Sequence, residues 1–319
     1  MQGKFNSMTA SQLGAVAIRA AVEQAGVKPG EVDDVIFGNV LGAGQGQAPA
    51  RQAALGAGLD NTTPATTINK MCGSGMKAAM MAFDQLTSGQ ATIVVAGGME
   101  SMTNAPHLLP KGRGGIRYGH GQILDHMAFD GLENAYDGKP MGTFADATAK
   151  KYGFTREEMD AYAKESTTRA VNASKSGGFK DEIAPVTVKG RKGDEVVSED
   201  ETPFAVNVEK IPTLRPAFNK DGTVTAATSS SISDGAAALV MMTESEAKKR
   251  GVKPLARVVA YASNAHEPEW FTTAPVGAIK KVLDKAGWKV SDVDLFEVNE
   301  AFAVVTMAAM KDVGCLLYT

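Results

Sequence analysis

The sequence is poor in several residue types, and each shortage narrows the possible functions. It contains two cysteines, far apart in unlike contexts, and four histidines, so neither a disulfide framework nor a zinc-type cluster is expected. No apolar run approaches the length of a membrane span. The formal net charge of −3 gives no electrostatic footprint for nucleic acid or an anionic membrane. We therefore expect a cytoplasmic protein with no metal ion, no nucleic-acid partner and no membrane partner.

The chain is long enough for more than one packed unit, since 44% of its 319 residues are hydrophobic. Two similar stretches, residues 17–26 and 278–287, each predict an amphipathic helix closed by a glycine. Each continues through a polar loop into a predicted strand, at residues 32–37 in the first copy and 293–298 in the second. The pattern predicts two copies of one α/β unit.

One of the two cysteines stands between two predicted elements. Residues 65–69 are rich in β-branched side chains and residues 76–86 have helical composition, so Cys72 is predicted at a strand-to-helix turn. The N–H groups and the dipole at a helix N-terminus favour a thiolate there. Gly73 and Gly75 allow a tight turn and leave room for a substrate. By spacing alone, a small buried core residue is the favoured interpretation of Cys72, because free cysteines are usually core.

Residues 69–77, which read Asn-Lys-Met-Cys-Gly-Ser-Gly-Met-Lys, resemble the nucleophile motif of the thiolases, the acetyl-CoA acetyltransferases. Four further stretches match thiolase motifs in thiolase order, at residues 94–102, 221–226, 233–238 and 298–302. Together these matches run through nearly the whole chain, which is far more specific than a single short pattern. The chain is identified as a member of this family.

The resemblance implies an α/β fold, with a duplicated five-layer α-β-α-β-α architecture, an inserted loop domain and an incomplete second half. The first half would span residues 1–245 and the second residues 252–319. The insertion is expected at about residues 103–230, where the sequence is dense in glycine, proline and charge. In the family this region covers coenzyme A.

A basic stretch inside the insertion has two interpretations. Lys111, Arg113 and Arg117 crowd one short segment. In thiolases a segment like residues 112–119 helps to tether dimers into tetramers, which implies a homodimer or homotetramer. An ordinary solvated basic loop is the alternative.

The sequence departs from the family at both ends, as a truncated chain would. Thiolases usually start with a strand that ends in an Arg-Thr-Pro-like turn, and Met1 begins just after it. The second copy stops before a Gly-His-Pro histidine, which activates the nucleophile, and a Cys-x-Gly cysteine, which acts as acid and base. The histidines and the other cysteine of the chain do not substitute for these two residues, because none stands in the family setting: His107, His120, His126, His266 and Cys315. We therefore expect the chain as written to be impaired or inactive in condensation.

The reaction implied by the resemblance is the reversible Claisen condensation of two acetyl-CoA to acetoacetyl-CoA and coenzyme A, with no cofactor. Cys72 would attack the thioester and hold the acyl group, and its own N–H would be one oxyanion donor. Asn299 matches a residue that holds a donor water at the enolate, although alone it could also cap a strand end. Ser230, one of three adjacent serines, matches a contact to the pantetheine arm.

Five apolar residues match positions that line the acyl tunnel or lie beside Asn299: Leu132, Met141, Phe218, Ala301 and Phe302. Any of them could be plain core. Pro140 stands where biosynthetic thiolases often have a histidine, which is a departure at a coenzyme contact. Residues 42–46 are rich in glycine but lack the spacing of a dinucleotide-binding site.

The resemblance favours a short-chain biosynthetic thiolase of fatty acid and ketone metabolism. Three alternatives stay open at this point. One is a catalytically inactive thiolase fragment, and another is a 3-ketoacyl-CoA thiolase that prefers longer chains. The third is a decarboxylating condensing enzyme, which the thiolase-specific motifs around Cys72 disfavour.

Overall fold

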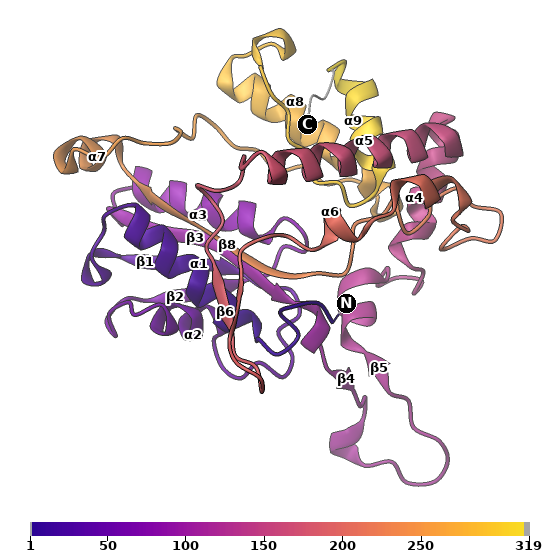
Figure 1. Ribbon diagram of the computed structural model, residues 1–319, viewed down its shortest axis with the longest axis horizontal. Coiled ribbons are helices and arrows are strands. Elements are labelled where there is room, and N and C mark those ends of the chain that lie inside the picture. The colour runs from indigo at the N-terminus through magenta and orange to yellow at the C-terminus, as the bar shows by residue number, and fades with distance from the viewer. Residues whose placement is uncertain (1, 316–319) are drawn as a thin grey trace. The chain divides into compact units, whose positions relative to one another are not determined.

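The computed structural model describes residues 2–315 of the chain, which form two compact units (Figure 1). Unit 1 comprises Met1–Leu132, Ala184–Ser198 and Ile232–Arg257, and unit 2 comprises Glu133–Ile183, Glu199–Ser231 and Val258–Thr319. The predicted halves, residues 1–245 and 252–319, divide the chain differently and remain a prediction. Met1 and residues 316–319 of those halves lie outside the described residues.

Unit 1 is built on a four-stranded sheet with the strand order β2-β1-β3-β8. Strand β1 (Asp34–Gly38) lies parallel to both β2 (Ala65–Ile68) and β3 (Ile93–Ser101). Strand β8 (Asp234–Met242) lies antiparallel to β3 along the full length of both strands. Parallel strands need a crossover connection, and here α2 (Pro49–Gly56) and α3 (Ser74–Thr87) provide the two crossovers.

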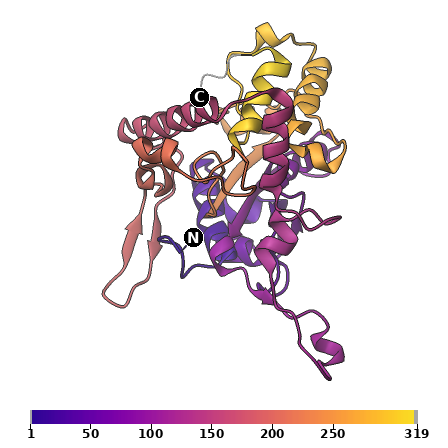
Figure 2. The same cartoon turned by 90° about the vertical axis from the view of Figure 1, so that its right-hand side faces the viewer.

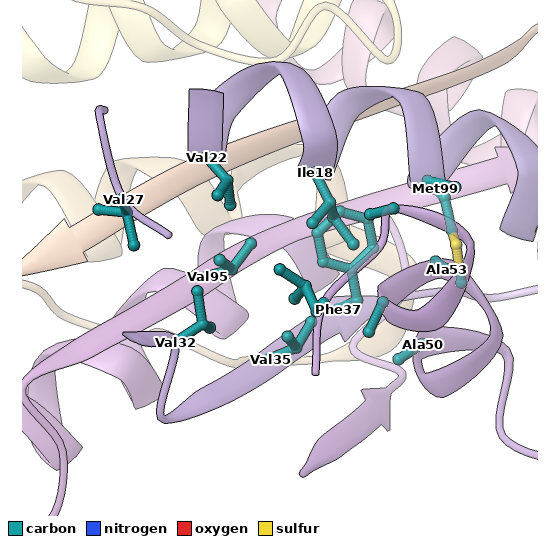
Figure 3. Close-up of a cluster of buried hydrophobic side chains, with 14 of the residues drawn as sticks. Ile18, Val22, Val27, Val32, Val35, Phe37, Ala50, Ala53, Val95 and Met99 are labelled. Atoms are coloured by element: carbon teal, nitrogen blue, oxygen red, sulfur yellow. The ribbon is translucent and has the colours of Figure 1, made fainter. Parts of the chain in front are cut away.

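Helices cover both faces of this sheet. Successive strand residues point to opposite sides, so apolar residues of one strand pack against helices on either face. Val35 and Phe37 of β1 pack in one cluster with residues of α1 (Ala10–Gln24) and α2 (Figure 3). Ile36, between them in sequence, packs instead in a second cluster with residues of α3. Unit 1 is therefore a helix–sheet–helix sandwich, which confirms the predicted α/β class.

Several short elements complete unit 1. Strands β4 (His107–Leu108) and β5 (Leu124–Asp125) pair antiparallel, and a π-helical turn follows at Ala128–Leu132. Strands β6 (Val186–Val188) and β7 (Glu195–Val197) form the long hairpin seen in Figure 2. Helix α7 (Glu244–Arg250) starts after β8, with Thr243 as its N-cap.

Unit 2 is helical in the part that the structure describes. Its helices are α4 (Met141–Tyr152), α5 (Arg156–Lys175), α6 (Thr202–Ala205), α8 (Ala274–Ala286) and α9 (Ala303–Val313). One cluster of buried residues joins α4, α5, α8 and α9 to the segment that ends at Phe302. Three of these helices, α4, α5 and α6, lie within the region predicted as a loop-rich insertion.

The predicted repeat is confirmed in its helices but not in its second strand. Helices α1 and α8 are followed by Gly26 and Gly287, with φ of 63° and 69°, and then by similar 3-10 turns. After the first turn the chain enters β1. The strand predicted at residues 293–298 is wrong, because the structure has no strand there. A strand needs a neighbour to pair its backbone groups, and the described residues of unit 2 include no other strand.

Candidate active site

Cys72 lies in the turn between β2 and α3, as the sequence predicts, and its side chain is exposed. Helix α3 begins at Ser74 with Gly73 as its N-cap. Met71, just before the cysteine, has a left-handed φ of 48°. The exposure excludes the alternative that Cys72 is a buried core residue. The thiol is thus presented at the N-terminus of a 14-residue helix, where the dipole favours a negative charge.

Polar side chains from the motif itself hold this turn. The hydroxyl of Ser74 accepts from the N–H of Lys70 (2.9 Å) and donates to the carbonyl of Met71 (2.6 Å). The carboxamide oxygen of Asn69 accepts from the N–H of Met71 (2.9 Å). These bonds satisfy backbone groups that neither the strand nor the helix can reach. No sequence pattern predicts this role of Asn69 and Ser74.

The start of α3 approaches the sheet closely, which is possible because residue 38 is a glycine. A Cβ atom at Gly38, the last residue of β1, would lie 2.5 Å from the Cβ of Ser74. At Gly75 the nearest atoms to an added Cβ, in Gly97 of β3, would be 3.7 Å away. Gly38 therefore sets how near α3 and its cysteine come to β1.

A cavity of about 400 Å³ opens beside Cys72 within unit 1. Its lining residues are Gly38, Asn39, Val40, Leu41, Met71, Cys72, Ser74, Gly75, Gly98, Met99, Glu100, Met102, Met127, Gly131, Leu132, Gly235 and Ala236. Most of this lining is apolar or glycine, which suits a small acyl group more than a charged one. Leu132, predicted to shape acyl specificity, belongs to the lining, at the end of the π-helical turn.

Glu100 is the acidic residue of this cavity. Its carboxylate accepts from the N–H groups of Val40 (2.8 Å) and Leu41 (3.0 Å) and from the carboxamide of Asn39 (2.7 Å). Burial raises the pKa of Glu100 above its usual range, although the N–H groups of Val40 and Leu41 act in the opposite direction. The motif at residues 94–102 contains this residue. Its role is not evident from sequence, because a glutamate at the end of a predicted strand is usually solvated.

A buried histidine stands close to the cavity wall. His126 is 5% exposed, and its Nδ1 lies 2.6 Å from a carboxylate oxygen of Asp130. Its Nε2 accepts from the N–H of Ala43, so Nδ1 carries the proton and donates to Asp130. Both ring nitrogens are therefore engaged in local structure. The other three histidines, His107, His120 and His266, are exposed.

The remaining predicted site residues lie in unit 2, where two motifs pair with each other. The N–H of Ser230 donates to the carbonyl of Ala301 (3.0 Å), and the N–H of Ala303 donates to the carbonyl of Thr228 (2.9 Å). The structure thus brings the serine segment beside the segment that carries Asn299. Asn299 is exposed.

Among the three adjacent serines, Ser230 differs from its two neighbours in the contacts it makes. The hydroxyl of Ser229 donates to the carbonyl of Thr225 (2.7 Å), and that of Ser231 lies 3.4 Å from the hydroxyl of Thr202. Ser230 is exposed, and the bond that holds it to Ala301 uses its backbone N–H.

The predicted apolar residues of unit 2 also gather together. The rings of Phe218 and Phe302 meet edge to face, with centroids 5.9 Å apart. A Cβ atom at Gly142 would collide with the ring of Phe218, so the start of α4 lies against it. Met141 and Ala301 pack at the edge of the same buried cluster, and Phe302 belongs to it. Phe302 is therefore core, whereas Phe218 is 38% exposed.

The acidic neighbour of Asn299 is tied to α5. Glu300 accepts from the hydroxyls of Tyr162 (2.5 Å) and Ser166 (2.7 Å), one helical turn apart. Burial, and then the bond to Glu300, hold the pKa of Tyr162 above its usual range. The bonds fix the segment that carries Asn299 against a 20-residue helix.

Among residues 2–315, no group of three or more histidine, cysteine, aspartate or glutamate side chains could hold a metal ion. No helix formed by these residues is long and apolar enough to cross a membrane.

Comparison with known proteins gives matches along the whole chain. Residues 1–245 match the family described as thiolase, N-terminal domain, and residues 252–317 match thiolase, C-terminal domain. The sequence is 48% identical over 313 residues to an acetyl-CoA acetyltransferase of Rhizobium meliloti, covering 98% of this chain and 79% of the relative. It is 49% identical over 315 residues to the mitochondrial acetyl-CoA acetyltransferase A of Xenopus laevis, covering 98% and 74%.

A solved structure is similar over nearly the full chain. It is the Acat5 thiolase of Ascaris suum in complex with coenzyme A. The TM-score is 0.93 at 40% sequence identity, and the match covers 99% of this chain and 81% of the other.

Proposed function

The chain belongs to the thiolase family, and from that premise we propose that it is an acetyl-CoA acetyltransferase that works through an acyl-cysteine intermediate on Cys72. The observation that carries the proposal is the exposed Cys72 thiol at the N-terminus of α3, beside an apolar cavity. The relatives named acetyl-CoA acetyltransferase support this choice of substrate. The relative solved with coenzyme A supports a coenzyme A thioester as the acyl donor.

In the first half-reaction, the sulfur of Cys72 attacks the carbonyl carbon of acetyl-CoA. The carbon–sulfur bond to coenzyme A breaks, coenzyme A leaves as its thiolate, and the acetyl group stays on Cys72. The N–H of Cys72 is one donor to the oxyanion that forms in this step. The helix N-terminus helps because it stabilises the thiolate before attack.

In the second half-reaction, another acetyl-CoA loses an α-proton, which ends on the coenzyme A thiolate released in the first half-reaction, and its carbanion attacks the acetyl carbon on Cys72. Acetoacetyl-CoA leaves and the cysteine thiolate is regenerated, so two acetyl-CoA give one acetoacetyl-CoA and one coenzyme A. We assign Asn299 to hold a water that donates to the developing enolate. The exposed position of Asn299, on a segment fixed by Glu300, supports this role.

We assign the other site residues to the coenzyme and the acyl group. Ser230 contacts the pantetheine arm, and its exposure supports this assignment over its two neighbours. Leu132 borders the cavity beside Cys72, so we assign it to acyl-chain selection. Met141, Phe218, Ala301 and Phe302 shape the apolar surroundings of the segment that carries Asn299.

Isotope exchange tests the first half-reaction by itself. Labelled coenzyme A is incubated with unlabelled acetyl-CoA and the protein, and we expect label to enter acetyl-CoA, because a ping-pong acyl transfer is reversible at this step. A Cys72→Ala variant should show no exchange above the rate without protein. Exchange that persists in this variant would overturn the assignment of Cys72. Exchange with butanoyl-CoA but not with acetyl-CoA would favour the longer-chain alternative.

For a polypeptide of these 319 residues we further propose that condensation is much slower than exchange. Condensation needs a proton to be removed from carbon, which exchange does not, and in the family the Cys-x-Gly cysteine does this. Cys315 is buried and does not stand in that setting. A missing general base commonly costs about two to four orders of magnitude in rate. Acetoacetyl-CoA formation, measured by chromatography in the same reactions, should therefore be at least about a hundredfold slower than exchange. Equal rates would contradict this.

We also propose a homodimer or homotetramer in the cytoplasm, acting in fatty acid and ketone metabolism. The two cysteines are free thiols, which suits a reducing compartment. Light scattering at several protein concentrations tests the oligomeric state. Because the Xenopus relative is named as mitochondrial, cell fractionation is the test of location.

A further inference from the structure

The wall of the Cys72 cavity includes a short irregular segment, Asn39 to Leu41, which follows β1. Such a segment has no ladder of its own to hold it in place. One backbone bond, from the N–H of Asn39 to the carbonyl of Ile68 (3.0 Å), continues the pairing of β1 with β2. The next two N–H groups, at Val40 and Leu41, do not bond to the sheet backbone but to a side chain.

That side chain is Glu100, at the far end of β3. Its Oε2 accepts from the N–H of Val40 (2.8 Å), and its Oε1 accepts from the N–H of Leu41 (3.0 Å) and from the carboxamide of Asn39 (2.7 Å). One carboxylate therefore accepts three bonds from three consecutive residues of the wall. A charged acceptor makes such bonds shorter and stronger than a neutral one.

The carbonyl side of the same segment is held by a second side chain. The carboxamide of Gln45 donates to the carbonyl of Leu41 (2.7 Å) and to the side-chain oxygen of Asn39 (3.0 Å). Asn39 itself is 4% exposed and also donates to the carbonyl of Met99 (3.2 Å). The wall segment is thus fixed from both sides, by a carboxylate and by a carboxamide.

Burying a carboxylate at this location costs free energy, which suggests that the carboxylate has a function there. Glu100 borders a mostly apolar cavity, and burial opposes its charge. A glutamine would fill the same volume without that cost. However, a glutamine cannot replace the carboxylate here, because its NH₂ group would face either the N–H of Val40 or the N–H of Leu41, and two donors repel each other.

We propose that Glu100 is a positioning residue that sets acyl-chain selectivity, by holding the Asn39–Leu41 wall against the acyl group on Cys72. This inference rests on the proposed function, because acylation of Cys72 is its readout. Glu100 acts through the wall and exchanges no proton with the substrate. If the wall relaxes, the cavity beside Cys72 widens, and a longer acyl chain loses its disadvantage relative to acetyl.

The test compares the rates at which acetyl-CoA and butanoyl-CoA acylate Cys72, followed by mass spectrometry in the wild-type chain and in Glu100→Gln. We expect acetylation to slow by about tenfold in the variant, because misplacing a group near the reacting atoms is costly. The butanoyl-to-acetyl rate ratio should rise by at least about threefold, a part of the roughly 10- to 200-fold discrimination that one methylene is worth in a pocket. Glu23→Gln, at an exposed glutamate of α1, is the matched control and should leave both rates unchanged.

The outcomes separate positioning from a general structural role. If Glu100→Gln slows both acyl donors by the same factor, or slows neither, the proposal is wrong. If Glu100→Gln does not fold, Gln45→Ala decides, since it releases the wall from the carbonyl side and should raise the same ratio; an unchanged ratio there would also refute the proposal. If neither donor acylates the wild-type Cys72, the proposed function itself fails, and this inference fails with it.

Discussion

At the residue scale, the position of Cys72 depends on Asn69 and Ser74. Both belong to the nucleophile motif, but the motif by itself does not indicate what they do. Ser74 bonds across the turn to Lys70 and to Met71, and Asn69 adds a third bond. Together they hold the exposed thiol at the start of α3. The sequence predicted the cysteine and its turn, because a β-branched run followed by helical composition is a local signal. It did not predict the bonds, which depend on the geometry of the turn.

The role of Glu100 could not be predicted from the sequence. Its function, as proposed, requires that the end of β3 lie beside the segment after β1. That neighbourhood follows from the register of the parallel pair, in which Gly38 stands opposite Gly98. Residues 60 positions apart in sequence give no local signal of such contact.

The pKa of Glu100 gives a pH prediction for stability. Burial raises this pKa in the folded protein above the ordinary value of 4.5, so the native state binds the proton more tightly than the unfolded chain does. Its contribution to stability is then complete below about pH 4.5 and is lost as the pH rises through the folded pKa. The unfolding free energy of the wild type should therefore fall relative to that of Glu100→Gln as the pH rises from about 4.5 through the folded pKa.

Urea unfolding of the two proteins at a series of pH values measures this difference. The control is Glu23→Gln, whose difference from the wild type should stay flat over the same range. A wild-type advantage over Glu100→Gln that grows with pH would contradict the assignment, because it would mean that bonds to the carboxylate outweigh its burial.

At the element scale, the junction of β1 and α3 is the most demanding contact around the site. An alanine at Gly38 would place its Cβ 2.5 Å from the Cβ of Ser74 and 2.9 Å from its backbone carbon, so the helix start must move. We predict that Gly38→Ala lowers the unfolding free energy by about 1 to 3 kcal/mol, as overpacking commonly does. It should also slow the acylation of Cys72.

Gly75→Ala is the matched control, since its added Cβ meets nothing nearer than 3.7 Å. Alanine is the better helix former, so the unfolding free energy should change by less than about 1 kcal/mol, with a gain in stability favoured. Denaturant unfolding reports both values. Equal effects of the two substitutions would show that the close approach at Gly38 does not matter.

Helix α5 was missed at the sequence level, although its signals were present. Thr155 and Glu158 form a capping box at its start. The helix is strongly polar, so the region was interpreted by its glycine, proline and charge content and not by helical periodicity. Its buried contacts are few along its length, and two of its hydroxyls are used for Glu300. Composition alone cannot distinguish a polar loop from a polar capped helix.

The link from α5 to Glu300 is testable through Tyr162. The Tyr162→Phe change removes a donor to Glu300 and leaves Ser166 as its remaining hydroxyl partner of α5. We predict a loss of about 1 to 3 kcal/mol in unfolding free energy, as for a bond to a charged group. Tyr136→Phe, at a tyrosine that is 83% exposed, should change it by less than about 0.5 kcal/mol. Thermal or denaturant unfolding distinguishes the two, and a neutral Tyr162→Phe would contradict the link.

At the scale of the whole molecule, the compact units do not follow the order of the chain. Ala184–Ser198 belongs to unit 1, although the segments before and after it belong to unit 2. The sequence predicted the family and the α/β sandwich of unit 1, because motifs and helical repeats are local. It did not predict this exchange of segments, which depends on long-range packing. The strand predicted at residues 293–298 was wrong for the same reason, since a strand is completed by its neighbour.

Exposed leucines give a prediction for the behaviour of the chain in solution. Leu255 is 95% exposed and Leu295 is 74% exposed, and exposed apolar groups promote association. Replacing both by serine should raise the protein concentration at which turbidity appears. The unfolding free energy should change by less than about 0.5 kcal/mol, as at other surface sites. By contrast, Leu283→Ser at a buried position of α8 should destabilise. An unchanged turbidity threshold in the double variant would contradict the prediction.

The measurement that tests the central claim most directly is mass spectrometry of the chain after incubation with acetyl-CoA. The second cysteine is an internal control, because Cys315 is buried and burial raises its pKa. We predict one added acetyl group, mapped by peptide analysis to Cys72 and absent from Cys72→Ala. No adduct on the folded protein, or an adduct on Cys315 alone, would contradict the assignment of Cys72 as the nucleophile.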